Sequence, residues 1–132
     1  MARTASDTYN HDWNDDTWTT GSPTTAAETL STTTESLTGA IDCKAFWSLQ
    51  VTVDINYAAT PTDDISISVY GSTNGTDWDE TAMDFIAGDK SEDPEQLTFM
   101  LFNPPAYVRL GFLQSGSTDS HVISTVKYIG FN

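Results

Sequence analysis

Basic residues are scarce in this sequence. Lys and Arg together number 5, against 19 Asp and Glu, which gives a formal net charge of −14 at pH 7. Such a surface repels the phosphates of nucleic acids and the headgroups of anionic lipids. We therefore expect neither nucleic acid nor a membrane as a partner. Because salt screens repulsion between like charges, any assembly of this chain should be sensitive to salt.

Cysteine and long apolar runs are also lacking. Cys43 is the single cysteine, so no disulfide can form within the chain, and we expect it to be a half-buried structural residue at a strand start. Residues 1–7 have no apolar signal region, and no apolar run reaches the roughly 18 residues of a membrane helix. The 132 residues suit one domain made in the cytoplasm, large enough to bury its own core.

Alternation of apolar and polar residues is the strongest pattern that is present. Between residues 46 and 57 every second residue is apolar, which predicts a strand with one buried face. The same alternation predicts strands over residues 64–70, 96–102, 106–113 and 121–131. Weaker patterns predict strands near residues 28–34 and 81–86. In the 96–102 strand, Met100 and Phe102 point to the face opposite that of Leu97, Phe99 and Leu101. We therefore expect both faces of this strand to be covered.

The segments between these strands carry turn residues. Asn74-Gly75 is a tight-turn signal because both residues tolerate positive φ, and Pro104-Pro105 interrupts another pair of strands. Seven or eight short strands without a helix predict an all-β fold, a two-layer antiparallel β-sandwich with jelly-roll-like strand order. We assign residues 26–132 to this sandwich domain.

Residues 1–25 are polar and lack strand or helix periodicity, which predicts an extended N-terminal arm. Trp13 and Trp18 interrupt its polarity. Two interpretations stay open at this point, since these rings can fold back onto the core of their own domain or dock on a neighbouring subunit. The second interpretation makes Trp13 and Trp18 candidate protein-interaction residues.

No set of residues demands catalysis. The two histidines, His11 and His121, lie far apart in the sequence, and no Gly-x-Ser-x-Gly motif is present. The carboxylate pairs Asp15-Asp16 and Asp63-Asp64 consist of adjacent residues, whereas a glycosidase needs two carboxyl groups facing each other across a cleft. We therefore expect a protein that is not an enzyme.

No cofactor is expected either. Acidic and amide side chains gather in the segment 74–79 and in the arm at 11–16, which makes Ca²⁺ a ligand to consider. Neither cluster has the spacing of an EF-hand loop, so a turn with solvated charges is the simpler interpretation. Calcium binding is thus unsupported by a motif.

Trp78 and Arg109 each allow two interpretations. Trp78 can cap the core of the sandwich, or it can stack on a sugar ring together with Tyr70 or Tyr107. Arg109 can form a partly buried ion pair with an acid such as Asp54 or Asp84, or it can contact a ligand anion. The ligand-binding alternative therefore names Trp78, Tyr70, Tyr107 and Arg109 as candidate site residues.

Two segments carry a resemblance to known proteins. They are Ser68-Val69-Tyr70-Gly71-Ser72-Thr73-Asn74-Gly75-Thr76-Asp77-Trp78 and Pro105-Ala106-Tyr107-Val108-Arg109-Leu110. Together they resemble the strand, turn and tryptophan signature of small β-sandwich proteins. One such group comprises decoration, head-fibre and tail-accessory proteins of tailed bacteriophage virions, and another comprises discoidin-like domains that bind carbohydrates and lipids. The resemblance covers about residues 40–131.

The phage group implies a structural virion protein, an acidic capsid decoration or head/tail accessory subunit that acts through protein–protein contacts. Its implied partners are other virion proteins, such as the major capsid protein or a tail or neck protein. The implied location is the virion, after synthesis in the host cytoplasm. A homo-oligomer is expected, of which a trimer is one form that hides sheet edges. The alternative function is a carbohydrate-binding β-sandwich module.

Overall fold

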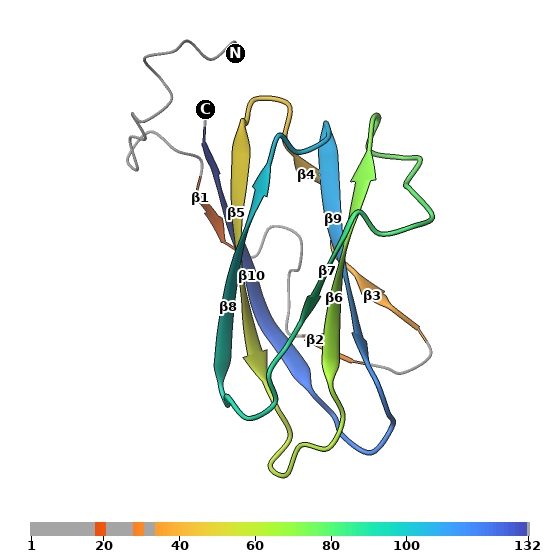
Figure 1. The fold of residues 1–132 in the computed structure, drawn as a ribbon, viewed down its shortest axis with the longest axis vertical. Helices are drawn as coiled ribbons and strands as arrows, with labels where there is room; N and C mark the ends of the chain where they lie inside the picture. The colour runs from red at the N-terminus through yellow and green to blue at the C-terminus, as the bar shows by residue number, and fades with distance from the viewer. Residues whose placement is uncertain (1–17, 21–27, 31–33, 132) are drawn as a thin grey trace.

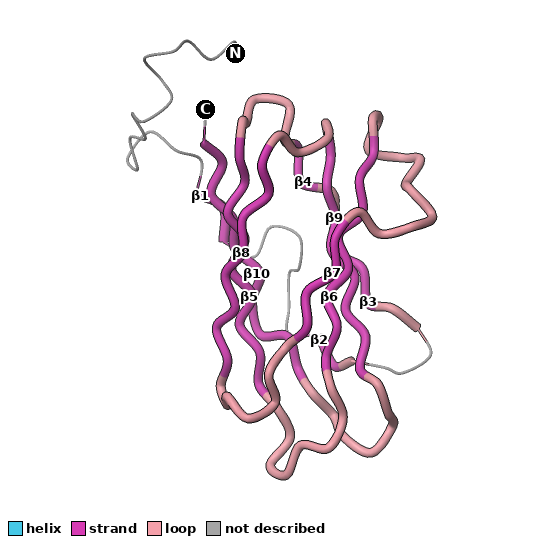
Figure 2. Tube along the Cα trace, in the orientation of Figure 1, coloured by secondary structure: helices cyan, strands magenta, loops and turns pink. Residues whose placement is uncertain are grey.

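Strands alone make up the regular structure of the described residues. The computed structural model describes residues 18–20, 28–30 and 34–131, and Figures 1 and 2 show strands joined by loops in this part of the chain. The strands are β1 (Trp18–Thr20), β2 (Glu28–Thr29), β3 (Ser36–Leu37), β4 (Ile41–Asp42), β5 (Ser48–Asn56), β6 (Ile65–Ser72), β7 (Asp84–Ala87), β8 (Glu95–Phe102), β9 (Tyr107–Gln114) and β10 (Val122–Phe131). None of the described residues belongs to a helix that could cross a membrane.

The strands form two antiparallel sheets packed face to face. Sheet A has the order β1-β10-β5-β8, with β2 also paired to β10, and sheet B has the order β3-β9-β6-β7, with β4 also paired to β9. From β7 to β10 the chain crosses to the other sheet after every strand (Figure 1). The two sheet orders together are those of a jelly roll, and they confirm the predicted all-β sandwich.

The core lies between the two sheets and follows from the alternation seen in the sequence. On β5 the side chains of Leu49, Val51, Val53 and Ile55 are fully buried. From sheet B, strands β6 and β9 contribute the buried side chains that face β5, which are Ile65, Ile67, Val69, Val108, Leu110 and Phe112. In sheet A, β10 adds Ile123 and Val126 beside β5. Each central strand therefore directs its intervening residues to an outer face of the sandwich.

The short strands were harder to predict than the long ones. Strands β3 and β4 have two residues each, too few to show a period, and neither was predicted from sequence. Strand β7 starts at Asp84, three residues later than expected, because Asp79–Met83 belong to the loop that returns from β6. Their places depend on partners in β6 and β9 rather than on local pattern.

The N-terminal segment is described only in part. Trp18–Thr20, which lie within the predicted arm, form β1 and pair with β10 from Trp18 opposite Ile129 to Thr20 opposite Lys127. Trp13 lies outside the described residues, and so does the side chain of Trp18. The division of the chain at residue 25 and the interaction role of the two tryptophans stay predictions.

Strand β8 differs from the expectation that both of its faces are covered. Its inward side chains, Leu97 and Phe99, pack against the core, while Met100 and Phe102 on the other face are 38% and 73% exposed. That expectation is wrong because β8 is the edge strand of sheet A, and among the described residues no further layer covers its outer face.

Truncating one inward side chain of β5 should destabilise the whole sandwich. Leu49→Ala removes a fully buried side chain between the sheets, and we expect the free energy of unfolding to fall by about 2–5 kcal/mol. Gln50→Ala, one residue along on the outer face, should change it by about 0.5 kcal/mol or less. Urea denaturation of both variants measures the difference. Equal losses would contradict the assignment of the two faces.

Candidate functional site

The outer face of sheet B collects the aromatic and cationic residues that the sequence singled out. In the pairing of β6 with β9, Tyr70 lies opposite Arg109 and Ser72 lies opposite Tyr107. Because directly opposed residues in antiparallel strands point to the same side, these side chains share one face. Their neighbours Val69 and Leu110 point the other way and are fully buried.

A hydrogen-bonded turn places Trp78 beside this face. The side-chain oxygen of Asn74 accepts hydrogen bonds from the backbone N–H groups of Thr76 and Asp77, both at 2.8 Å. The Ser72 hydroxyl donates to the backbone carbonyl of Asp77 at 2.6 Å. Gly75, with φ of 78°, brings the turn close to Tyr107, since a Cβ there would lie 3.3 Å from a ring carbon. The loop is therefore fixed on the sheet.

Arg109 lies at the centre of the group. Its guanidinium carbon is 4.5 Å from the centroid of the Trp78 ring and 5.9 Å from the centroid of the Tyr70 ring. Both distances lie within the range of cation–π attraction. We call Tyr70, Trp78, Tyr107 and Arg109 the aromatic–arginine cluster. All four candidate ligand-binding residues of the sequence are thus on one surface.

Two of the structural interpretations made for these residues are wrong. Trp78 is not part of the buried core, because its loop lies over the outer face of sheet B. Arg109 has no acid within 4.0 Å among the described residues, and its buried Nε has no hydrogen-bond partner there. The proposed partner Asp54 lies on β5 of the opposite sheet, where it pairs with Lys127 at 3.6 Å.

Glu35 borders the cluster on the side of Tyr70. The Tyr70 hydroxyl donates to the two carboxylate oxygens of Glu35 at 2.8 and 3.0 Å. Desolvation first, and then this hydrogen bond, raises the pKa of Tyr70. Gly111 makes room for the carboxylate, since a Cβ at that position would lie 2.3 Å from its carbon atom. The glycine therefore permits an acid to lie flat on the sheet.

Lys44 borders the cluster on the side of Tyr107. Its ammonium group donates to the Tyr107 hydroxyl at 2.8 Å and lies 4.9 Å from the centroid of the ring. Asp42 is 3.5 Å from the same ammonium group. The hydrogen bond to Tyr107, followed by the charge of Asp42, raises the pKa of Lys44. The face therefore offers aromatic surface, hydrogen-bond donors and carboxylate acceptors within one patch.

A second polar cluster joins the β5–β6 loop to the β9–β10 loop. His121 is fully buried, accepts the N–H of Ala58 on Nδ1 at 3.1 Å and lies with Nε2 2.8 Å from the carbonyl of Asp63. One carboxylate oxygen of Asp119 accepts the N–H groups of Thr62 and Asp63, both at 2.7 Å. These groups satisfy one another, so the cluster holds the two loops together rather than facing a ligand.

The remaining candidate residues have structural surroundings. In the segment considered for Ca²⁺, Asn74 donates to the Asp77 carboxylate at 2.8 Å as part of the turn. The residues described here include no group of three or more His, Cys, Asp or Glu able to hold a metal ion. Cys43 is 2% exposed, more buried than expected, and burial raises the pKa of its thiol to about 12. The thiol is therefore unreactive at neutral pH.

Sequence reasoning missed Glu35 and Lys44. Neither lies in a patterned strand, and each reaches the cluster only because β3 and β4 pair with β9. One signal was available for Glu35: Gly111 stands within an otherwise regular strand pattern, and a glycine there indicates close approach by another group. No comparable signal pointed to Lys44.

Comparison with known proteins finds a solved structure that shares the fold of this chain. No protein-family model matches the sequence, and neither does any curated protein. Among solved structures, the chain is similar to the Clostridium thermocellum endo-1,4-β-D-xylanase 10B, in a structure of its CBM22-1 and GH10 modules complexed with xylohexaose. The match has 12% sequence identity and a TM-score of 0.53, and it covers 90% of this chain and 25% of that one. At this identity the similarity shows a shared β-sandwich fold.

Asp119 should make the stability of the sandwich depend on acid pH. Hydrogen bonds from the backbone, with that from Asp63 the largest contribution, lower the pKa of Asp119, so its charged form stabilises the fold above the unfolded-state pKa of about 4. This contribution is lost as pH falls through the lowered pKa. We expect Asp119→Asn to be less stable than the parent at neutral pH, with the difference shrinking as the pH falls. Urea denaturation across the pH range tests this, and a pH-independent difference would contradict it.

Proposed function

We propose that this protein is a non-catalytic carbohydrate-binding module that holds a neutral glycan on the outer face of sheet B. The observation that carries the proposal is the convergence of the aromatic–arginine cluster. Two strands and one loop bring Tyr70, Trp78, Tyr107 and Arg109 together, although 39 positions separate the first from the last. The core does not need these side chains, because their neighbours on β6 and β9 already fill it.

The chemistry of the face matches that of a sugar ring. A pyranose presents apolar C–H groups on its faces, which pack on aromatic rings, and hydroxyl groups at its rim, which both donate and accept hydrogen bonds. Arg109 and Lys44 supply donors, and the carboxylate of Glu35 supplies acceptors. Arg109 is not neutralised by a neighbouring acid among the described residues, so its outer N–H groups are available to ligand oxygens.

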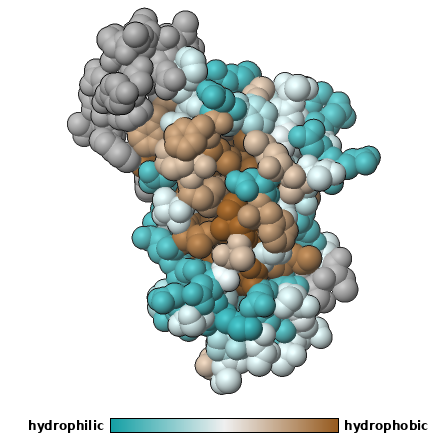
Figure 3. Space-filling model, viewed as in Figure 1, coloured by the Kyte–Doolittle hydropathy of each residue, from teal (hydrophilic) through white to brown (hydrophobic). Residues whose placement is uncertain are grey.

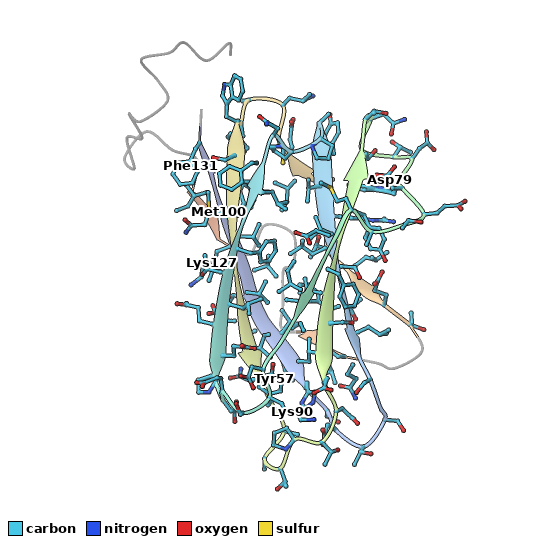
Figure 4. The ribbon with its side chains drawn as sticks, viewed as in Figure 1. Tyr57, Asp79, Lys90, Met100, Lys127 and Phe131 are labelled. Carbon is cyan, nitrogen blue, oxygen red and sulfur yellow. The ribbon has the colours of Figure 1, made fainter. Side chains whose placement is uncertain are left out.

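Charge favours a neutral glycan over an anionic one. Glu35 and Asp42 flank the cluster on two sides, and the chain as a whole carries −14. A polyanion would meet repulsion from both sources, whereas neutral hydroxyl groups can bond to the acids and the cations alike. Asp79, labelled in Figure 4 beside the β6–β7 loop, adds a further carboxylate near this end of the sheet.

The structural neighbour supports the same proposal. That structure contains a CBM22-1 carbohydrate-binding module and xylohexaose, and its match to this chain shows a shared β-sandwich fold. Fold likeness alone assigns no ligand, so the cluster carries the argument and the neighbour supplies the first probe.

Isothermal titration with xylohexaose and with other neutral β-linked hexasaccharides tests the proposal. We expect binding to at least one of these glycans, and Trp78→Ala should weaken it by about tenfold or more because the largest ring of the platform is lost. Arg109→Lys keeps the charge but not the planar group, and it should also weaken binding.

Phe102→Ala is the matched control, because it removes an exposed aromatic ring from the opposite sheet and should leave glycan affinity unchanged. Circular dichroism and thermal melting show whether each variant is folded. Absence of binding to every neutral glycan, or equal affinity of a folded Trp78→Ala variant, would overturn the proposal.

A structural virion role is the second candidate. The observation that favours it is the number of large apolar side chains left exposed, which are Leu37, Met83, Phe85, Met100 and Phe102. Exposed apolar surface of this kind marks protein contacts. In this case the partners would be a capsid, tail or neck protein, and Trp13 and Trp18 in the N-terminal segment would add contacts.

Mass spectrometry of purified phage particles tests this second candidate. A decoration protein should be present in hundreds of copies per particle, and a tail or neck component in a handful, because repeated sites give avidity on a symmetric particle. Replacing Trp13 and Trp18 by Ala should then reduce incorporation, while Trp47→Ala in the sandwich serves for comparison. Particles that lack the chain altogether would rule the role out.

A further inference from the structure

The outer edge of β8 is the longest strand edge left unpaired among the described residues. Strand β8 has eight residues and pairs only with β5, in unbroken register from Ser48 opposite Phe102 to Ile55 opposite Glu95. In the part of the chain that the structure describes, nothing pairs with its other side. Its backbone N–H and C=O groups on that side are therefore available to another strand.

Apolar side chains surround this edge. Figure 3 shows hydrophobic residues gathered in a band between the two sheets on the face that carries β7 and β8. Within β8, Leu97 and Phe99 are only half buried, and Phe102 is the most exposed large apolar residue described. In Figure 4, Met100 lies with Lys127 on the side of the molecule away from sheet B. Apolar side chains thus line both faces of the sheet at this free edge, and exposed apolar surface of this kind marks interaction sites.

The devices that normally protect an edge strand are missing from β8. Protected edges are short, bulged, or carry Lys or Pro. The other edges conform to this rule, since β1, β2, β3, β4 and β7 have between two and four residues each. Strand β8 has no bulge in its pairing, and the run from Gln96 to Phe102 contains no charged residue and no proline.

We propose that β8 pairs with β8 of a second copy of this chain. The two strands run antiparallel about a twofold axis that is perpendicular to sheet A and passes midway between Phe99 of one copy and Phe99 of the other. In this register Phe99 faces its own symmetry mate and Leu97 faces Leu101 of the second copy. The result is one continuous sheet in which the two copies of sheet A share a single inner face.

The sequence of β8 is complementary to itself in this register. Leu97, Phe99 and Leu101 all point into the sandwich, so each inward residue meets another inward apolar residue across the axis. On the outer face, Thr98 meets Met100, and Gln96 meets Phe102. A shift of the register by one residue would place each inward apolar side chain opposite an outward residue of the second copy. The inner faces of the two copies of sheet A would then no longer lie on the same side.

The position of the charged residue of β8 favours this orientation of a second copy over the others. Glu95 is the only charged residue of β8 and lies at its N-terminal end. The twofold axis therefore separates the two Glu95 residues by eight positions, roughly 26 Å at 3.3 Å per residue, which exceeds the Debye length in physiological salt. A parallel or end-matched arrangement would instead bring them together.

The exposed area sets the strength of the pairing. Phe102, Met100 and the half-buried side chains of β8 expose an apolar area on the order of 300 Å² per copy, given that a fully exposed Phe presents roughly 200 Å². Two copies thus contribute roughly 600 Å² of apolar area, which is less than a stable specific interface buries, and backbone hydrogen bonds between the two β8 strands supply the rest of a weak, transient contact. We expect a dimer that dissociates on dilution and strengthens as salt screens the net charge.

Sedimentation velocity over a concentration series, with a matched pair of charge variants, tests this arrangement. Thr98→Lys places a lysine on the edge strand, and Thr118→Lys places one in the exposed β9–β10 loop. Both variants lower the magnitude of the net charge equally. If β8 forms the interface, Thr98→Lys should raise the dissociation constant by about tenfold or more and Thr118→Lys should leave it unchanged or lower it.

Amide hydrogen exchange of the unmodified chain provides a measurement without a variant. We expect the amides of β8 that point away from β5 to exchange more slowly as concentration rises, and those of β7 to be unaffected. Three outcomes would overturn the proposal: a monomer at all concentrations, a dimer that Thr98→Lys leaves intact, or equal protection at all concentrations of the β8 amides that point away from β5, which would mean that the chain covers its own edge. Thermal melting confirms that both variants are folded.

Discussion

The packing of one inward face of each sheet against the other determines nearly everything else in this molecule. Val53 on β5, Ile67 on β6 and Leu110 on β9 lie in one interior with no exposure to solvent. Because the side chains of a strand alternate, burial of these residues forces their neighbours outward. Tyr70 and Arg109 thus face solvent as a direct result of the burial of Val69 and Leu110 beside them. The candidate binding surface therefore lies on the outer face of the same strands, β6 and β9, whose alternate residues form the core.

Much of this arrangement could be predicted from sequence, and the missing parts have a common cause. The long strands were found because each carries a full period of alternation, and Tyr70, Trp78, Tyr107 and Arg109 were recognised as a candidate set. Which acid lies near Arg109 depends on which sheet each strand joins, and alternation contains no information on sheet membership. Asp54 was therefore proposed for Arg109 although it faces Lys127 on the other side of the sandwich.

The distribution of charge explains why an acidic chain can still present a binding face. Lys44, Lys90 and Lys127 each lie within 4.0 Å of an acid, so these three cations are locally neutralised. Arg109 is held instead by aromatic rings, which attract a cation without cancelling its charge. A guanidinium kept in this way retains its affinity for oxygen ligands even though acids dominate the surface around it.

The central place of β10 in sheet A has a consequence for how the chain reaches its fold. Strand β10 is the last of the ten in sequence, yet it lies between β5 and β1 and also pairs with β2. The β5–β8 pair can therefore form during synthesis, but β1 and β2 have no partner in sheet A until β10 has left the ribosome. Completion of sheet A must wait for residues 122–131, and contacts between such distant segments slow folding. Until then the apolar inner faces of β5 and β8 have no β10 beside them, and apolar surface exposed in this way makes a partly folded chain prone to aggregate.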